Sequence, residues 1–244
     1  MPQQLDRDGS TPLYVQLTEI LRGKIEQGDW KPERRIPSEN ELHRTYGISR
    51  MTARQVLAQL VNEGLLYRVQ GKGTFVAPEK ISTRSLAYKG IREQLEQMGY
   101  ATATKLLSIE VAEPDQRVRR HLDLPGGARA YAIRRLRFAD DEPISLHTSY
   151  IPETVAPGLD EHDTVNQQLC VVLEDSFGLR MDHVTETLET TFASKQEAEL
   201  LGVSRAAPLL LLQQQITNRA GTRFEYSKVV FRGDKIRLHF EYEL

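Results

Sequence analysis

The sequence predicts an α+β protein in two parts: a helical N-terminal domain with one small β-hairpin, and a larger C-terminal domain built on an antiparallel sheet. Two observations support this fold class. Apolar residues recur at helical spacing up to about residue 63, whereas most segments after residue 100 alternate apolar and polar residues with the period of a strand. Short helical segments lie between those later strands, which is typical of α+β domains. A chain of 244 residues is also long enough for two domains.

The composition is that of a globular protein in a reducing compartment. Apolar residues make up 39% of the chain and charged residues 27%, which are ordinary values for a soluble protein. The single cysteine, Cys170, excludes an internal disulfide framework. No apolar run approaches the roughly 18 residues of a membrane span, and the first residues lack the segments of a signal peptide. We therefore expect a cytoplasmic protein without a membrane partner.

The sequence lacks the motifs of common enzyme and metal sites. It contains no G-x-S-x-G, no H-E-x-x-H, no Walker loop and no cluster of cysteines and histidines. The six histidines are scattered along the chain. We therefore expect no enzymatic activity, no metal and no cofactor.

A first helix is predicted from Pro12, which suits the first helical position, to Gly28. Trp30, the only tryptophan, follows it and is expected to anchor the core. The apolar residues that give the helical spacing are Leu13, Leu17, Ile20, Leu21 and Ile25.

Two short helices with a tight turn between them come next. Ser38 is expected to cap the first, with Glu41 closing a capping box, and Gly47 to supply the left-handed residue that ends it. Ser49 then caps a second helix, which runs to about Glu63. The short turn between two short helices predicts a helix-turn-helix.

The second of these helices divides along its length. Its C-terminal half gathers apolar residues that can anchor in a core, and its N-terminal half gathers polar and basic residues. A DNA recognition helix needs this division, because its first turns reach base edges and phosphates. The candidate contacts on this helix are Ser49, Arg50, Thr52, Arg54 and Gln55.

A small hairpin completes the N-terminal domain. Residues 65–69 and 74–76 suit strands, and the glycine turn between them carries a cation. Gly71 and Gly73 would let this wing approach a groove, and Lys72 would supply charge for a phosphate. Residues 34–72 hold seven Lys or Arg against three Glu, a local balance of +4, although the whole chain carries a net charge of -2.

The remaining residues are predicted to form a second domain. Residues 77–87 have no clear period and are expected to be a linker, so that the domains are 1–76 and 88–244. Helices are expected at 88–98, 114–122, 165–177 and 194–202, and strands at 105–112, 128–138, 143–151, 181–192, 208–217, 223–231 and 236–242.

The N-terminal part resembles the DNA-binding domain of the GntR family of bacterial transcription regulators. This resemblance implies a winged helix-turn-helix that binds a double-stranded operator. Many relatives carry arginine where this chain has Asn40, so Ser38 and Asn40 join the candidate DNA contacts. Because one reading head is small, we expect a homodimer on a palindromic site. The resemblance rests on Pro37-Ser38-Glu39, Gly47-Ile48-Ser49-Arg50-Met51-Thr52, Arg54-Gln55 and residues 60–64 and 71–76.

The C-terminal part resembles the effector-binding domain of the HutC-like subfamily of GntR regulators, which has a chorismate-lyase-like fold. Such a domain implies a small-molecule effector. The residues that carry this resemblance are Arg135-Leu136-Arg137, Glu142-Pro143-Ile144, Ile151-Pro152, Glu197-Ala198, Leu201-Gly202-Val203, Pro208-Leu209-Leu210, Phe224-Glu225-Tyr226-Ser227 and Phe231-Arg232-Gly233-Asp234.

Arg135 and Arg137 lie two positions apart on a predicted strand, so their side chains point to one face. Two convergent guanidinium groups could hold a phosphate or carboxylate. The alternatives are a solvated face, or ion pairs with Glu189 or Glu225 across strands. Arg134 is expected on the opposite face. Cys170 falls in an apolar run and is expected to be a buried, inert thiol.

Relatives that sense an amino-sugar phosphate carry matching arginines as phosphate ligands, which favours the anion site. His147 stands where they carry glutamate, although a lone histidine is also a common structural residue. Phe231 replaces their tyrosine, and Gln168 and Cys170 replace a serine and a tyrosine, whereas Glu225 matches. These changes predict a different anion: a phosphorylated sugar, a phosphonate or a carboxylate.

Together these observations predict a DNA-binding regulator, a repressor that a small anionic effector releases from its operator. Two alternatives remain at this point. One is a chorismate-lyase-like enzyme, which would leave the winged helix unexplained. The other is a DNA-binding protein that senses nothing and uses its second domain to dimerise.

Overall fold

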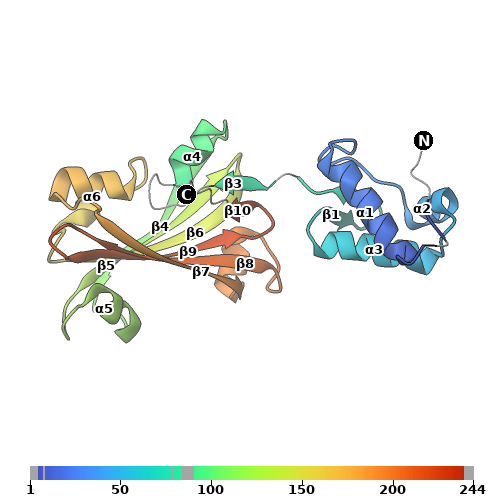
Figure 1. Ribbon diagram of the computed structural model, residues 1–244. Helices are drawn as coiled ribbons and strands as arrows, with labels where there is room; N and C mark the ends of the chain where they lie inside the picture. The colour runs from blue at the N-terminus through green and yellow to red at the C-terminus, as the bar shows by residue number, and fades with distance from the viewer. Residues whose placement is uncertain (1–4, 8, 79, 84–90, 239–244) are drawn as a thin grey trace. The chain divides into compact units, whose positions relative to one another are not determined.

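The computed structural model describes residues 5–7, 9–78, 80–83 and 91–238. The chain forms two compact units, which divide between Glu79 and Lys80 (Figure 1). Each unit has its own buried apolar cluster, so each is described by itself.

The N-terminal unit consists of three helices and a hairpin, as predicted. Its elements are α1 (Leu13–Glu26), α2 (Glu39–Tyr46), α3 (Arg50–Asn62), β1 (Leu66–Val69) and β2 (Gly73–Val76). One buried cluster joins all three helices and includes Trp30, which confirms the predicted core anchor. The start of α1 differs slightly from the prediction, since Pro12 is the residue before the helix and Leu13 is its first residue.

Local signals fix the ends of α2 and α3. Ser38 Oγ accepts a hydrogen bond from the Glu41 N–H at 3.3 Å, and the Glu41 carboxylate accepts one from the Ser38 N–H at 2.7 Å. This is the predicted capping box. Gly47 ends α2 in the left-handed conformation, with φ 64°. Ser49 Oγ then accepts from the Thr52 N–H at 3.0 Å and begins α3.

The hairpin is extended by backbone that the sequence did not predict to be strand-like. β1 and β2 pair antiparallel, with Leu66 opposite Val76. On the other side of β2, the Ile36 N–H donates to the Thr74 carbonyl and the Val76 N–H to the Arg34 carbonyl, both at 2.9 Å. The wing is therefore tied to the segment that leads into α2.

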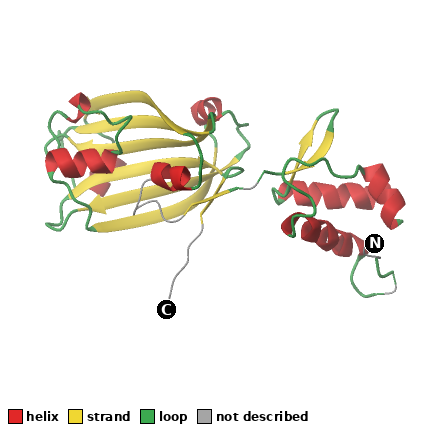
Figure 2. Cartoon of the chain, turned by 90° about the horizontal axis from the view of Figure 1, so that it is seen from above, coloured by secondary structure: helices red, strands yellow, loops and turns green. Residues whose placement is uncertain are grey.

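A six-stranded sheet with antiparallel neighbours dominates the C-terminal unit (Figure 2). The order across the sheet is β4-β5-β6-β9-β8-β7. The strands are β4 (Thr102–Ala112), β5 (Ala130–Ala139), β6 (Glu142–Pro152), β7 (His183–Phe192), β8 (Pro208–Thr217) and β9 (Arg223–Arg232).

Helices pack against both faces of this sheet, which confirms the predicted α+β class (Figure 1). On one face lie α4 (Ile91–Gln97) and α6 (Leu169–Phe177), whose apolar residues cluster with Phe231 and Ile133 respectively. On the other face lie α5 (Gln116–Leu122), which packs on Tyr226, and α7 (Lys195–Leu201), which packs on Leu136. A 3₁₀ turn, η1 (Leu159–Glu161), precedes α6.

The predicted linker, residues 77–87, is wrong in one part. Ile81–Thr83 forms β3, which pairs in parallel with β10 (Ile236–Leu238) and belongs to the C-terminal unit. Three-residue strands carry too little periodicity to be found from sequence. Residues 84–87 of that linker, the start of the helix predicted from residue 88, and the end of the strand predicted to residue 242 lie outside the described residues.

The helix predicted from residue 165 begins four residues later, at Leu169. The reason is local. Asp163 Oδ1 accepts hydrogen bonds from the N–H groups of Val165 and Asn166 at 3.0 and 2.9 Å. Such an aspartate-centred turn competes with helical backbone hydrogen bonds, so the chain turns once before it becomes helical.

Candidate DNA-reading surface and ligand site

Helix α3, the predicted recognition helix, has one buried side and one exposed side. Ala53, Val56, Leu57 and Leu60 are buried against the N-terminal core. The predicted contacts Arg50, Arg54 and Gln55 are exposed, Thr52 is half-buried, and Ser49 caps the helix. The exposed side is therefore polar and basic over the first turns of the helix, where DNA contacts are made in this motif.

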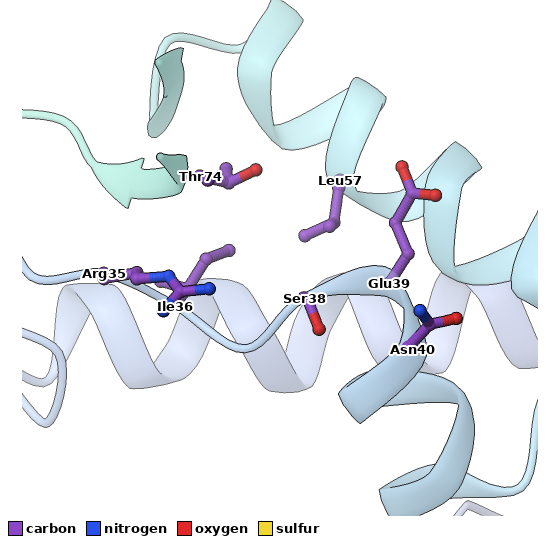
Figure 3. A pocket seen from close by; sticks show the side chains of 8 residues that line it. Arg35, Ile36, Ser38, Glu39, Asn40, Leu57 and Thr74 are labelled. Atoms are coloured by element: carbon purple, nitrogen blue, oxygen red, sulfur yellow. The ribbon is translucent and has the colours of Figure 1, made fainter. Parts of the chain in front are cut away.

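A hollow of about 270 Å³ lies beside the start of α2 (Figure 3). It brings together three predicted DNA residues, Ser38, Asn40 and Gly73, although they come from different segments. Ser38 and Asn40 come from the start of α2, whereas Gly73 begins β2 in the wing. The structure therefore places the wing beside the first helix of the motif, and these three candidate DNA contacts share one surface.

Arg35 lines the same hollow and was not selected from the sequence. Its side chain is exposed, and a Cβ atom added at Gly73 would lie only 3.0 Å from Arg35 Nε. Glycine at position 73, where φ is 122°, thus leaves room for this guanidinium group. The extended segment of residues 34–36 directs Arg35 here, and only the basic pair Arg34-Arg35 could have signalled it.

The tip of the wing is exposed at Gly71 and Lys72. Gly71 has φ 74°, a conformation that glycine adopts without strain. The Lys72 N–H donates to the Val69 carbonyl at 3.0 Å and closes the turn. Behind the tip, the rings of Tyr67 and Phe75 stack with centroids 5.6 Å apart. The lysine is thus held at the end of a stiffened hairpin.

In the C-terminal unit, Arg135 and Arg137 lie on one face of β5, as predicted, and both are buried. Their exposed fractions are 3% and 9%, so the alternative of a solvated face is wrong. Their partners on β6 are His147 and Ser145. Arg134 points to the opposite face and donates to Gln196 Oε1 at 3.2 Å.

Of the two carboxylates considered as ion-pair partners of the arginines, Glu225 lies on their face of the sheet and Glu189 does not. Glu189 lies on the face away from the arginines and accepts a hydrogen bond from Gln213 Nε2 at 3.4 Å, so it is not their partner. Glu225 is buried near Arg135. Burial raises the pKa of Glu225, and the charge of Arg135 opposes that shift.

The two buried guanidinium groups make few and long hydrogen bonds. Arg135 donates to the Thr164 carbonyl at 3.5 Å and to Ser149 Oγ at 3.3 Å, and Arg137 donates to Thr104 Oγ1 at 3.4 Å. Nε of each arginine is buried with no hydrogen-bond partner among the described residues. A buried donor without an acceptor is costly and rare in folded proteins, which marks these groups as available to a ligand.

A third arginine, Arg92 on α4, adjoins this pair and was missed from the sequence. It donates to the Asn166 carbonyl at 2.7 Å, its Nε lies 3.5 Å from Glu96, and that Nε also lacks a hydrogen-bond partner in the described structure. Its charge lowers the pKa of Arg137. The residue belongs to a helix far from β5 in sequence, so no spacing rule could have joined the two.

The three arginines give this cluster a positive charge that its neighbours only partly balance. Burial, followed by the charges of Arg135 and Arg92, lowers the pKa of Arg137 to about 9. Burial also lowers the pKa of Arg135, while Glu225 raises it. Burial and the two arginine charges hold the pKa of His147 well below its usual range, so this imidazole is neutral.

The other predicted ligand residues surround the arginines unequally. His147 Nε2 is 2.9 Å from Ser145 Oγ, and its ring meets Phe231 edge-on at 6.1 Å. Phe231 is fully buried in an apolar cluster with α4. Gln168 is the N-cap residue of α6, but its side chain makes no capping hydrogen bond to the helix. Its Oε1 atom lies 3.7 Å from Cys170 Sγ.

The remaining features agree with the sequence in part. Cys170 is half-buried rather than buried, and burial raises the pKa of its thiol, which favours the inert form. Ser145 and Ser149 flank His147 on β6 and were missed, although their alternation with Ile144 and Leu146 was a readable signal. Within the described ranges, no three metal-ligating side chains come together. No described helix is long and apolar enough to span a membrane.

These two units define a class of protein: a DNA-binding transcription regulator whose second domain binds a small molecule. The family model described as "Bacterial regulatory proteins, gntR family" matches residues 13–76. The model for the UTRA domain matches residues 97–237. The chain therefore belongs to the GntR family of bacterial regulators, in its HutC-like group with a UTRA effector domain.

Individual relatives and structures agree. The HTH-type transcriptional repressor NagR of Bacillus subtilis is 32% identical over 231 residues, which cover 95% of each chain. The histidine utilization repressor of Pseudomonas aeruginosa is 30% identical over 207 residues, 84% of this chain and 81% of that one. The crystal structure of PhnF from Mycobacterium smegmatis has the same fold, with a TM-score of 0.66 at 23% identity over 95% of this chain and 99% of PhnF. NagR and the histidine utilization repressor are transcriptional repressors, so the enzyme alternative is set aside.

Proposed function

We propose that this protein is a cytoplasmic repressor that binds a palindromic operator as a homodimer and leaves it when a small anionic metabolite binds at Arg135 and Arg137. The observation that carries the proposal is the pair of buried guanidinium groups whose Nε atoms have no acceptor among the described residues. An anion would supply both the missing acceptors and the missing charge.

Charge balance supports an anion rather than a neutral ligand. Arg92 has Glu96 as an ion-pair partner, and Arg135 has the charge of Glu225 nearby. No ion pair reaches Arg137 in the described part of the chain, and its pKa is lowered by burial and by the charges of Arg135 and Arg92, which is the cost of burying this cation beside two others. A bound phosphate, phosphonate or carboxylate would remove this cost. If the ligand does so in only one conformation of the protein, the difference in binding free energy between the two conformations can drive a switch.

The surroundings of the arginines suit a ligand that is polar beyond its anionic group. His147 is neutral and can donate or accept one hydrogen bond, and Ser149 and Gln168 offer further polar atoms. Glu225 could accept hydrogen bonds from a hydroxyl or an amine. We therefore favour a phosphorylated sugar, a phosphonate or a small carboxylate over a simple inorganic ion.

On DNA, each copy would present α3 to the major groove and Lys72 of the wing to the backbone. A single α3 reads only a few base pairs, so two copies related by a twofold axis would read a palindrome. The ligand need only prefer the dimer whose heads are wrongly spaced for the operator. A preference of about 1–3 kcal/mol is typical of allosteric coupling and changes occupancy many-fold.

The test measures operator binding with and without effector in three proteins. A thermal-shift screen of phosphorylated sugars, phosphonates and carboxylates first identifies a ligand, since a ligand of the native state raises the melting temperature. The double variant Arg135→Ala, Arg137→Ala should keep operator affinity and lose the effector response. Arg134→Ala, which removes an arginine from the other face of the same strand, should respond like wild type. If the double variant still releases DNA at the wild-type effector concentration, the ligand site lies elsewhere.

A further inference from the structure

We propose that strand β7 is the seam of the homodimer: the outer edges of β7 in two copies of the chain pair antiparallel about Leu188 and join the two sheets. This inference rests on the proposed homodimer and adds where and in what register the copies meet. The observations that support it are the state of the two sheet edges, the pattern of exposed apolar residues, and the self-complementarity of the β7 sequence.

The two edges of the sheet are not equivalent. β7 is at one edge, and its ten residues pair with β8 without a register shift. β4 is at the other edge, where a bulge at Leu107 interrupts the register between Leu106 and Ser108. Bulges protect an edge from pairing with another chain, whereas a long regular edge invites it. No strand of the described chain pairs with the outer side of β7.

β7 also exposes apolar side chains that a monomer has no reason to expose. Phe192 is 72% exposed and Leu188 41% exposed, and Val184, at the same spacing, is half-buried. These residues are four positions apart, so all three point to one face of the strand. A second copy is the partner that would cover them, because the sequence of the strand complements itself.

Antiparallel geometry allows few registers for a strand that pairs with its own copy. Directly opposite residues must both direct their backbone N–H and C=O groups toward the seam, or both away from it. A twofold axis through the seam must therefore pass at one residue rather than between two. With the axis at Leu188, the strand pairs over nine residues, from Val184 to Phe192.

That register matches the side chains on both faces. Leu188 meets its copy, and Val184 meets Phe192, so apolar residues meet apolar residues. Glu186 meets Thr190 and Glu189 meets Thr187, so no two carboxylates stand directly opposite, a placement that would be destabilising. Shifting the axis to either glutamate would oppose it to itself. An axis at Thr187 would set Glu186 against Leu188, and an axis at Thr190 would leave only five residues paired.

Cysteine crosslinking tests this register in the full-length protein, with Cys170→Ser as the background. Directly opposite Cα atoms lie about 4.5–5.5 Å apart, within reach of a disulfide. Leu188→Cys should therefore crosslink to its own copy on mild oxidation. Glu186→Cys is the matched control, because its copy would lie about four residues, or roughly 13 Å, away along the strand.

A mixture of two cysteine variants tests whether the two copies of β7 pair antiparallel. Val184→Cys and Phe192→Cys should each fail to crosslink alone, since each would be about 26 Å from its copy. After subunit exchange, an equimolar mixture of the two should crosslink. Circular dichroism confirms that the variants fold, and light scattering on the reduced proteins reports whether each is a dimer.

The outcomes separate this inference from the proposed function. A dimer by light scattering in which Leu188→Cys crosslinks no faster than Glu186→Cys would refute the β7 seam and leave the homodimer intact. A monomer at micromolar concentration would refute both. Crosslinking of Leu188→Cys, together with crosslinking of the mixture only, would establish the register.

Discussion

Replacing Arg137 with methionine should make the ligand-free protein more stable and at the same time insensitive to anions. The guanidinium group is buried, is 9% exposed, and forms no ion pair within the described residues. Methionine keeps an unbranched apolar stem of similar length and removes the charge. A residue that served only the fold would give the opposite result, because its removal would destabilise the protein.

The expected size follows from the pKa. A pKa of about 9, well below the usual range of an arginine, means that the folded protein binds the proton of Arg137 more weakly than the unfolded chain does. A pKa lowered this far corresponds to at most about 5 kcal/mol of lost stability at neutral pH. Replacing whole buried ion pairs with apolar residues stabilises some proteins by about 1–4 kcal/mol, and we expect Arg137→Met, which removes a buried charge that has no ion-pair partner to lose, to stabilise the C-terminal unit by a similar amount.

The pH dependence has a definite sign. Above about pH 9, and up to the usual pKa range of arginine, the unfolded chain binds more protons than the folded one, so the stability of the wild type rises with pH across this window. The penalty is complete below about pH 9. The advantage of Arg137→Met over wild type should therefore be constant near neutral pH and shrink above pH 9.

Urea unfolding followed by circular dichroism measures this effect, and the chain provides its own reference. Trp30 is the only tryptophan and lies in the N-terminal core, so its fluorescence reports that unit alone. Its transition should not move. Inorganic phosphate at millimolar concentration should raise the melting temperature of wild type and of Arg134→Met, but not of Arg137→Met. A variant that is less stable than wild type, or one that phosphate still stabilises, would contradict the anion site.

Three further predictions concern the reading head and one turn. Arg50→Ala and Arg54→Ala should each weaken operator binding by about 1–3 kcal/mol in a titration. Lys72→Ala should weaken binding to all DNA sequences equally and reduce the slope of log affinity against log salt concentration by about 1. Unchanged operator affinity in Arg50→Ala would show that α3 is not the helix that reads the DNA. Ser38→Ala should cost about 1 kcal/mol in the Trp30 transition by breaking the capping box, and an unshifted midpoint would contradict it. Asp141→Gly should stabilise the β5–β6 turn by about 0.5 kcal/mol, because Asp141 has φ 66°, and a lower melting temperature would count against this.

The reading head was predictable because its signals are local. The capping box of Ser38 and Glu41, the left-handed Gly47 and the cap at Ser49 each act within one turn of backbone, so the sequence states them directly. The β3–β10 pair was not predictable, because it joins residues about 155 positions apart through three residues each. Loop-closure and packing decide such contacts, and no short window of sequence contains them.

The candidate ligand site could be predicted only along strand β5. The period of two placed Arg135 and Arg137 together, and β5 bears this out. Their burial was not foreseen, because arginine is ordinarily exposed and the covering segments, α4 and the residues before α6, are distant in sequence. Arg92 lies on one of those covering segments, α4. Arg35 was missed for a related reason, since the backbone that directs it pairs with a wing some forty residues away.

The pairing of β3 with β10 shortens the connection between the two units. Once β3 is counted with the C-terminal unit, only residues 77–80 separate it from β2 of the wing. Four residues span at most about 14 Å, whereas the eleven residues of the predicted linker would span about 40 Å. Ile81, the first residue after this tether, belongs to the same buried cluster as Phe231, whose ring meets His147 beside the arginines. In the proposed homodimer, a connection of about four residues between the two units of each copy would limit the operator spacings that the pair of N-terminal units could reach.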